Sequence, residues 1–170
     1  MAATGRCVLE VVLESGLLLV VCGSAAGRRS AELGHYYAGR GNKFWATLAR
    51  VGLTPRRLEP SEYRLLPSFG IGLSDVVKAQ SGADSELDFT RASPDALRAK
   101  ILRFQPRVLC FNGKRAAQVF LRRPAVQFGV QKERIGVTQI FVAPSTSGAA
   151  NGFWDLSIWR RLARLASAHG

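Results

Sequence analysis

An unbroken apolar run near the start of the chain, Leu17–Cys22, is bounded by Gly16 and Gly23. A strand without a polar face is typical of a parallel sheet that helices cover on both sides. Two later β-rich runs, Val108–Phe111 and Thr138–Val142, are each followed by a turn sequence. Helical patterns alternate with these runs, which predicts an α/β fold: a three-layer α/β/α domain with a mainly parallel central sheet. The 170 residues fit a single domain over 1–170.

Four helices are expected from apolar residues that recur at helical spacing. Asn42 is placed to cap a helix that ends at Gly52. Ser93-Pro94 supplies the cap and the first-turn proline of a second helix. The other two are expected over Lys114–Leu121 and over the C-terminal stretch around 158–165.

The predicted strands end in loops that are candidates for a binding site. In a parallel sheet, the loops at the carboxyl ends of the strands form the usual ligand crevice. Three loops qualify, Gly23–Asn42, Asn112–Arg115 and Pro144–Gly152. A fourth segment, Gly70–Asp75, places a carboxylate just beyond an apolar stretch.

The chain is strongly basic. It has 24 Lys and Arg residues against 12 Asp and Glu residues, a formal net charge of +12 and a pI of about 10.8. Such an excess favours a polyanionic partner, because each Lys or Arg that contacts a phosphate releases condensed counterions. The alternative is a basic surface that is only solvated.

Few metal ligands are available in this chain. Cys7, Cys22 and Cys110 are too scattered for a thiolate site, and His35 and His169 are the only histidines. Widely spaced cysteines are typical of reduced thiols in the cytoplasm. The apolar run is also too short to span a bilayer, and it lacks the basic flank of a signal peptide. We therefore expect a cytoplasmic protein without a metal, an organic cofactor or a membrane segment.

By itself, Gly23–Ser30 suggests a phosphate-binding loop. The segment is one residue short of the Walker A spacing, and an arginine stands where that motif has its lysine. A nucleotide-binding enzyme is therefore the weaker interpretation.

Three segments in a fixed order carry more information. Residues 34–45 read Gly-His-Tyr-Tyr-Ala-Gly-Arg-Gly-Asn-Lys-Phe-Trp, and residues 111–114 read Phe-Asn-Gly-Lys. The third segment runs from Gln127 to Gly148 and ends in Val-Ala-Pro-Ser-Thr-Ser-Gly. Together they resemble the active-site motifs of the mismatch-specific uracil/thymine-DNA glycosylases, a branch of the uracil-DNA glycosylase superfamily. The similarity extends from about Leu17 to Ala166.

The resemblance implies a fold, an activity and a partner. It implies the layered fold of the superfamily and a monomer that acts on DNA containing uracil or another deaminated base. The implied reaction is hydrolysis of the N-glycosidic bond without strand cleavage and without a cofactor, as the first step of base-excision repair. A glycosylase must first extrude the target nucleotide from the stacked duplex into a pocket.

The resemblance also indicates residues of the base-binding pocket. Tyr37 falls where the family has its stacking aromatic residue, and the backbone N–H groups of Ser24 and Tyr37 are the expected donors to the base carbonyls. Asn42 matches a residue that supports the pocket, but it is equally explained as a helix cap. Ser145 stands where other branches of the superfamily have a histidine. His35 is either a base contact, a phosphate contact or a polar loop residue.

DNA contacts are expected around this pocket. In the family, the loop after the second motif enters the minor groove and fills the vacated stack, but here its residues are small, which makes a poor wedge. Lys114 is either a phosphate contact or a solvated lysine. The residues that we expect to contact DNA are Arg40, Lys43, Lys114, Ser147, Gly148, Ala149, Ala150 and Asn151.

One position departs from the family in a way that affects the chemistry. The first motif normally reads Gly-Ile-Asn-Pro-Gly, and its asparagine positions the attacking water. Here residues 23–27 read Gly-Ser-Ala-Ala-Gly, so Ala25 matches that asparagine and has no polar group to hold water. We expect Asp75 to take over, since a carboxylate both accepts a hydrogen bond from water and stabilises a cationic sugar. The alternatives for Asp75 are base recognition and a helix-cap or surface role.

The alanine also supports a second hypothesis from a different class. Without a group to hold the water, the protein would be a catalytically silent binder of damaged or single-stranded DNA. Incubation with uracil-containing DNA distinguishes the two hypotheses.

Overall fold

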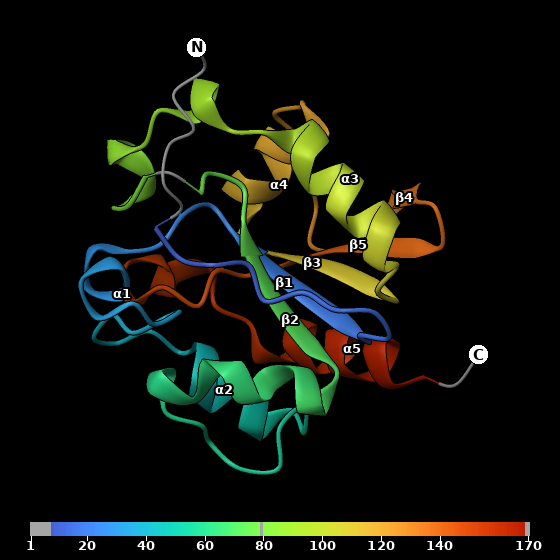
Figure 1. Ribbon diagram of the computed structural model, residues 1–170, viewed down its shortest axis with the longest axis horizontal. Coiled ribbons are helices and arrows are strands. Elements are labelled where there is room, and N and C mark those ends of the chain that lie inside the picture. The colour runs from blue at the N-terminus through green and yellow to red at the C-terminus, as the bar shows by residue number, and fades with distance from the viewer. Residues whose placement is uncertain (1–7, 79, 169–170) are drawn as a thin grey trace.

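The centre of the computed structural model, which describes residues 8–78 and 80–168, is a five-stranded sheet in the order β2-β1-β3-β5-β4 (Figure 1). The strands are β1 (Leu19–Gly23), β2 (Ile71–Asp75), β3 (Val108–Asn112), β4 (Gly129–Ile135) and β5 (Thr138–Ala143). Adjacent strands pair in parallel, except that the edge strand β4 pairs antiparallel with β5. The predicted mainly parallel sheet is confirmed.

Helices connect the strands and follow the last of them. The α-helices are α1 (Arg28–Leu33), α2 (Phe44–Arg50), α3 (Pro94–Phe104), α4 (Lys114–Leu121) and α5 (Leu156–Ser167). The 3₁₀ helices are η1 (Pro60–Phe69), η2 (Asp84–Glu86), η3 (Phe89–Arg91) and η4 (Gly148–Phe153).

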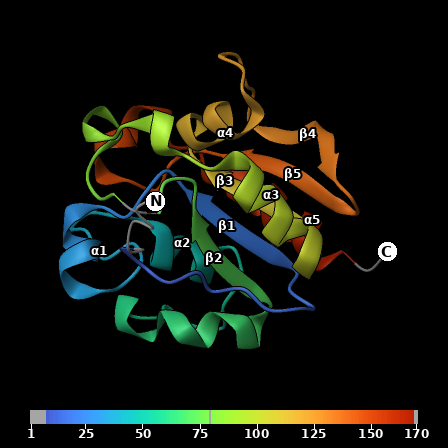
Figure 2. The same cartoon turned by 45° about the horizontal axis from the view of Figure 1, so that its top comes forward.

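The helices form one layer on each face of the sheet (Figures 1 and 2). Leu19 and Val21 of β1 belong to a core that β1 shares with α2, η1 and α5. Val20 and Cys22 belong to the opposite core, which includes residues of α3 and α4. Every residue of β1 is buried, which explains why this stretch of the sequence has no polar face. The predicted three-layer α/β/α arrangement is confirmed.

The element boundaries agree with the sequence pattern where that pattern is local. Helix α4 spans the predicted residues, and α3 begins at Pro94 as expected. Strand β1 is displaced by two residues at its start and by one at its end. The prediction missed the strands β2 and β4 and all four 3₁₀ helices. It also missed α1, which lies within the segment Gly23–Asn42 that was predicted to be a loop. In β4, buried and exposed residues alternate at the sheet edge and Val130 is half exposed, so the strand has no continuous apolar run.

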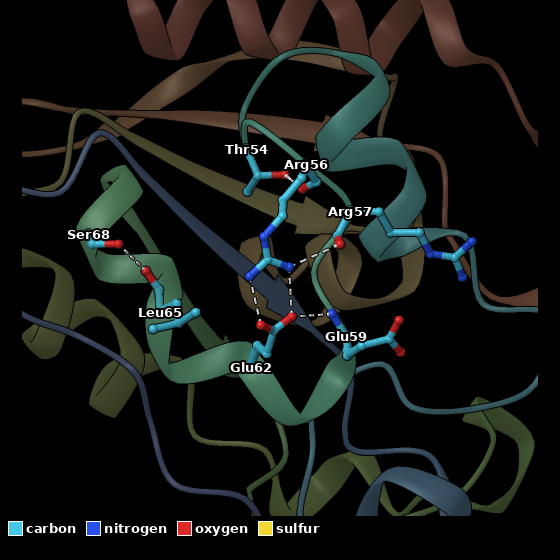
Figure 3. Close-up of polar contacts among 7 residues, drawn as sticks. All are labelled: Thr54, Arg56, Arg57, Glu59, Glu62, Leu65 and Ser68. Carbon is cyan, nitrogen blue, oxygen red and sulfur yellow. Dashed lines mark hydrogen bonds and ion pairs between the residues drawn. The ribbon is translucent and has the colours of Figure 1, made fainter.

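Polar contacts fix the start of η1, the element that leads into β2 (Figure 3). Arg56 Nη1 and Nη2 donate to the two carboxylate oxygens of Glu62 at 3.0 and 2.7 Å, and the backbone N–H of Glu59 donates to Glu62 Oε2 at 2.8 Å. The hydrogen bond from Arg56 lowers the pKa of Glu62 to about 2. At the other end, Gly70 adopts a φ of 78° and turns the chain into β2. The parallel pairing of β2 with β1 then places Asp75 beside Gly23.

Two further predictions concern the cysteine thiols and membrane-spanning segments. Cys22 and Cys110 are buried free thiols, whereas Cys7 and His169 lie outside the described residues. Within 8–78 and 80–168, none of the helices is long and apolar enough to cross a bilayer.

Candidate active site at the carboxyl edge of the sheet

Loops at the carboxyl ends of β1, β2, β3 and β5 enclose a pocket of about 910 Å³. The three loops predicted from the sequence all contribute to its walls, and residues 82–84 and 86 add another wall. The loops meet because parallel strands bring their carboxyl ends to one edge of the sheet. The volume falls within the range of small-molecule pockets, roughly 300–1,000 Å³.

Asp75 is one of the residues that line this pocket. It is the last residue of β2, pairs in register with Gly23 of β1, and is only 5% exposed. Its Oδ2 accepts a hydrogen bond from Lys78 Nζ at 3.2 Å. Its Oδ1 receives no hydrogen bond from the part of the chain that the structure describes, and Asp75 lines the pocket. One carboxylate oxygen is therefore held by the protein, and the other is left for a ligand or water.

Burial determines the electrostatics of Asp75. Loss of solvation raises the pKa of this carboxyl group above its ordinary value, and the positive charge and hydrogen bond of Lys78 oppose that rise. Because Asp75 is a buried strand residue, the alternative of a helix-cap or surface role is wrong.

Gly23 allows the carboxylate to sit this close to β1. A Cβ at position 23 would lie 3.1 Å from Asp75 Oδ1 and 3.3 Å from the Tyr37 hydroxyl. Gly23 is the first residue of the Gly-Ser-Ala-Ala-Gly segment. The glycine thus keeps open the space between two polar groups of the pocket.

Tyr37 adopts a backbone conformation that is uncommon for its residue type. Its φ is 53°, in the left-handed region, where non-glycine residues often mark functional sites. Its ring centroid lies 4.0 Å from that of Phe44 at an interplanar angle of 32°. The hydroxyl is buried and has no hydrogen-bond partner among the described residues. Burial and then the charge of Asp75 raise the pKa of Tyr37, so the hydroxyl stays protonated at neutral pH.

Asn112 is a structural residue of the site that the sequence analysis did not single out. Its Nδ2 donates to Thr146 Oγ1 at 2.9 Å, and its Oδ1 accepts from the Thr146 backbone N–H at 3.0 Å. The carbonyl of Thr146 in turn accepts from the Lys43 backbone N–H at 2.8 Å. Asn112 therefore ties the end of β3 to the loop after β5 and to the start of α2. Its place in an Asn-Gly turn was the available signal.

Most of the residues predicted for the base-binding pocket line the observed pocket. Asn42 Oδ1 accepts from the backbone N–H of Phe44, the first residue of α2, at 3.0 Å, although the N-cap position itself is occupied by Lys43. His35 is the exception, because it is not among the residues that line the pocket, and its ring lies 6.2 Å from that of Tyr63. The predicted residues that line the pocket are Ser24, Ala25, Tyr37, Asn42, Asp75 and Ser145.

The predicted DNA contacts fall into two groups. Lys43 and Asn151 do not line the pocket, and instead Lys43 Nζ donates to Asn151 Oδ1 and lies 5.3 Å from the centre of the Trp154 ring. Lys114 Nζ lies 4.5 Å from the centre of the Phe128 ring. Those that do line the pocket are Arg40, Lys114, Ser147, Gly148, Ala149 and Ala150.

Sequence reasoning missed four other residues that line the pocket. Arg28, Arg29 and Arg115 add positive charge, and Phe153 of η4 is an aromatic residue that is 75% exposed. The three arginines lie within two of the loops expected to form the ligand crevice, but the sequence analysis gave them no individual role. Phe153 lies just beyond the third predicted loop.

The layered sheet and its pocket define an α/β protein with a pocket at the carboxyl edge of its parallel strands, where open α/β sheets commonly bind ligands. Residues 13–163 match the family model of the uracil DNA glycosylase superfamily, and the chain belongs to that superfamily. The fold also resembles the solution NMR structure of a "putative Uracil DNA glycosylase" from Methanosarcina acetivorans. That likeness has a TM-score of 0.69 and 22% identity, and it covers 96% of this chain and 99% of the other.

Proposed function

We propose that this protein is a DNA glycosylase that hydrolyses the N-glycosidic bond of uracil in DNA, leaving an abasic site for base-excision repair. The observation that carries the proposal is the position of Asp75, a buried carboxylate with one oxygen left for a pocket ligand. Membership of the superfamily supports a glycosylase-like activity. Hypoxanthine and xanthine, which are also products of deamination, are proposed secondary substrates.

Base capture would use the polar groups and the aromatic ring of the pocket. The target nucleotide must leave the stack before its glycosidic bond is accessible. Because Phe44 packs against the Tyr37 ring, that ring is held in place to receive the base. The backbone N–H groups of Ser24 and Tyr37 would donate to the uracil carbonyls, with Asn42 and Ser145 forming the adjacent walls.

In the hydrolytic step, Asp75 Oδ1 would accept a hydrogen bond from a water molecule facing C1′ of the sugar. As the C1′–N1 bond breaks, its electron pair leaves with uracil, and the sugar gains the character of an oxocarbenium ion. The negative charge of Asp75 stabilises that cation. The water oxygen then bonds to C1′, and its proton passes to the Asp75 carboxylate. The departing uracil anion is stabilised by the backbone donors, so neither a metal nor an organic cofactor is needed.

The rim would hold the phosphate backbone. Arg40 and Lys114 line the pocket, and Lys43 lies just outside it beside Asn151. Contacts from these side chains and from residues 147–151 are not specific for sequence, which suits an enzyme that must examine all DNA. We propose that the protein acts on DNA as a monomer in the cytoplasm.

Ala25 supports one alternative, a protein that binds damaged or single-stranded DNA without cleaving it. Its methyl group lines the pocket where the family has a water-holding asparagine. On this alternative, Asp75 would read the base and would not activate water.

A single-turnover assay on four duplexes tests the proposal. The strands carry uracil, hypoxanthine, xanthine or thymine at one position, and an otherwise identical undamaged duplex is the control. We expect an alkali-labile site in the uracil duplex and none in the control. Binding to every duplex without any alkali-labile site would refute the glycosylase proposal in favour of the silent binder.

A further inference from the structure

Lys78 occupies an unusual position for a lysine. It lies three residues after Asp75, where the chain leaves β2, and its side chain is only 15% exposed. Its Nζ donates to Asp75 Oδ2 at 3.2 Å and to the Tyr36 hydroxyl at 3.0 Å. The ammonium also lies 5.3 Å from the centre of the Tyr36 ring. A long, flexible side chain is thus held by two hydrogen bonds and an aromatic contact.

The surroundings of Lys78 are fixed as well. Tyr36 is 2% exposed, and its hydroxyl donates to the Glu10 carbonyl at 2.7 Å, which leaves a lone pair of that oxygen to accept from Lys78. The Lys78 carbonyl accepts from the Val8 N–H at 2.8 Å, and the Val77 N–H donates to the Ser24 carbonyl at 2.7 Å. The backbone that carries the Lys78 side chain is therefore hydrogen-bonded to two other segments of the chain.

The other titratable groups around Asp75 do not neutralise its charge. Cys22 of β1 and the tyrosines Tyr36 and Tyr37 all have a raised pKa, with burial as the main cause and the charge of Asp75 as the second. These groups stay neutral at physiological pH. Among the described residues, Lys78 is the cation that lowers the pKa of Asp75.

We propose that Lys78 is a positioning residue, which keeps Asp75 ionised at neutral pH and ties down Oδ2 so that Oδ1 faces the reacting water. This inference rests on the role proposed above for Asp75. Burial alone favours the protonated acid, because the charged form loses its solvation. A protonated Asp75 would neither accept the water proton nor stabilise a sugar cation, so the pocket needs a buried counter-charge.

The test compares Lys78→Gln, Lys78→Arg and Lys78→Met with the wild type. Glutamine keeps hydrogen-bonding groups but removes the charge, so it remains informative if the methionine variant does not fold. Lys132→Met is the matched control, since Lys132 is an exposed lysine of β4 outside the pocket. Single-turnover uracil release is measured across the pH range, and the Asp75 carboxyl group is titrated by carbon-13 NMR in the free protein.

We expect Lys78→Gln to slow uracil release at neutral pH by about tenfold or more, since a general base in the wrong protonation state loses most of its effect. Raising the pH should shrink this loss, and the NMR titration of Asp75 should move to higher pH. Lys78→Arg should restore most of the neutral-pH rate, and Lys132→Met should match the wild type.

A loss of the same factor at every pH would overturn the inference, because it would indicate a structural role alone. An unchanged NMR titration of Asp75 in Lys78→Gln would also overturn it. The two proposals fail separately: a wild type that releases no uracil refutes the glycosylase proposal, while the NMR titration still decides whether Lys78 keeps Asp75 ionised.

Discussion

Replacing Asp75 with asparagine should remove most of the turnover and leave the fold intact. Asparagine keeps the size of the side chain and one oxygen, but it carries no charge and accepts no proton. A positioned general base contributes about a hundredfold to ten-thousandfold in rate. At about 1.4 kcal/mol for each factor of ten, this corresponds to roughly 3–5 kcal/mol of transition-state stabilisation. We expect a loss near the upper end, because the charge of Asp75 also stabilises the sugar cation.

The same substitution should not destabilise the protein at neutral pH. Burial raises the pKa of Asp75 in the folded state above its value in the unfolded chain. For a group shifted in this direction, the stability contribution is fully present below the unfolded pKa and is lost as the pH rises through the folded pKa. Ionised Asp75 therefore lowers the stability of the wild type in the pH range where it supports turnover. Asp75→Asn removes this cost but leaves the Lys78 ammonium, whose side chain is 15% exposed, without its counter-charge, so the variant should stay folded at neutral pH with a stability close to that of the wild type.

The assay is single-turnover release of uracil from a duplex, with enzyme in excess. DNA affinity and thermal unfolding of the same preparations serve as controls for binding and folding. Asp75→Ala is the second variant, since it removes the oxygen as well as the charge. If both variants keep the wild-type single-turnover rate, the water is held elsewhere and the reasoning about Asp75 is wrong.

Three further outcomes are expected. DNA affinity should fall steeply as salt rises, because a chain with a net charge of +12 releases counterions on binding, and a flat salt dependence would contradict a phosphate-binding rim. Tyr37→Ala should reduce turnover more than nonspecific affinity, and unchanged turnover would remove Tyr37 as the stacking platform. Gly23→Ala should slow single-turnover release about tenfold or more while the fold survives, because the alanine methyl group would lie 3.1 Å from Asp75 Oδ1 and small displacements of a catalytic group reduce rates strongly. A wild-type rate in this variant would mean that the reaction does not use the space beside Gly23.

Local sequence patterns were sufficient for much of the fold. The apolar run at β1 predicted a central strand because it is buried on both faces, and Lys114–Leu121 predicted α4 because its apolar face repeats at helical spacing. The parallel order of the strands then brought the three predicted loops to one pocket. Asp75 belonged to the site for the same reason, since it ends a strand next to β1.

Contacts between distant side chains could not be predicted in this way. Asn112 and Thr146 are 34 positions apart, and Lys78 meets Tyr36 across 42 positions. No periodicity in the sequence encodes such pairs, because they depend on how strands and loops pack. A matched motif can also include a residue that lies outside the pocket. His35 belongs to such a motif, but the fold places its ring beside Tyr63 and not in the pocket.

Hydrolysis by this pocket is tested most directly by detecting free uracil released from a uracil-containing duplex in the presence of a metal chelator, by wild type and Asp75→Asn side by side. We expect free uracil from the wild type, with a DNA strand that breaks only after alkali treatment, and little release from the variant. DNA binding without release, or release that chelation abolishes and zinc restores, would contradict hydrolysis by the residues of this pocket.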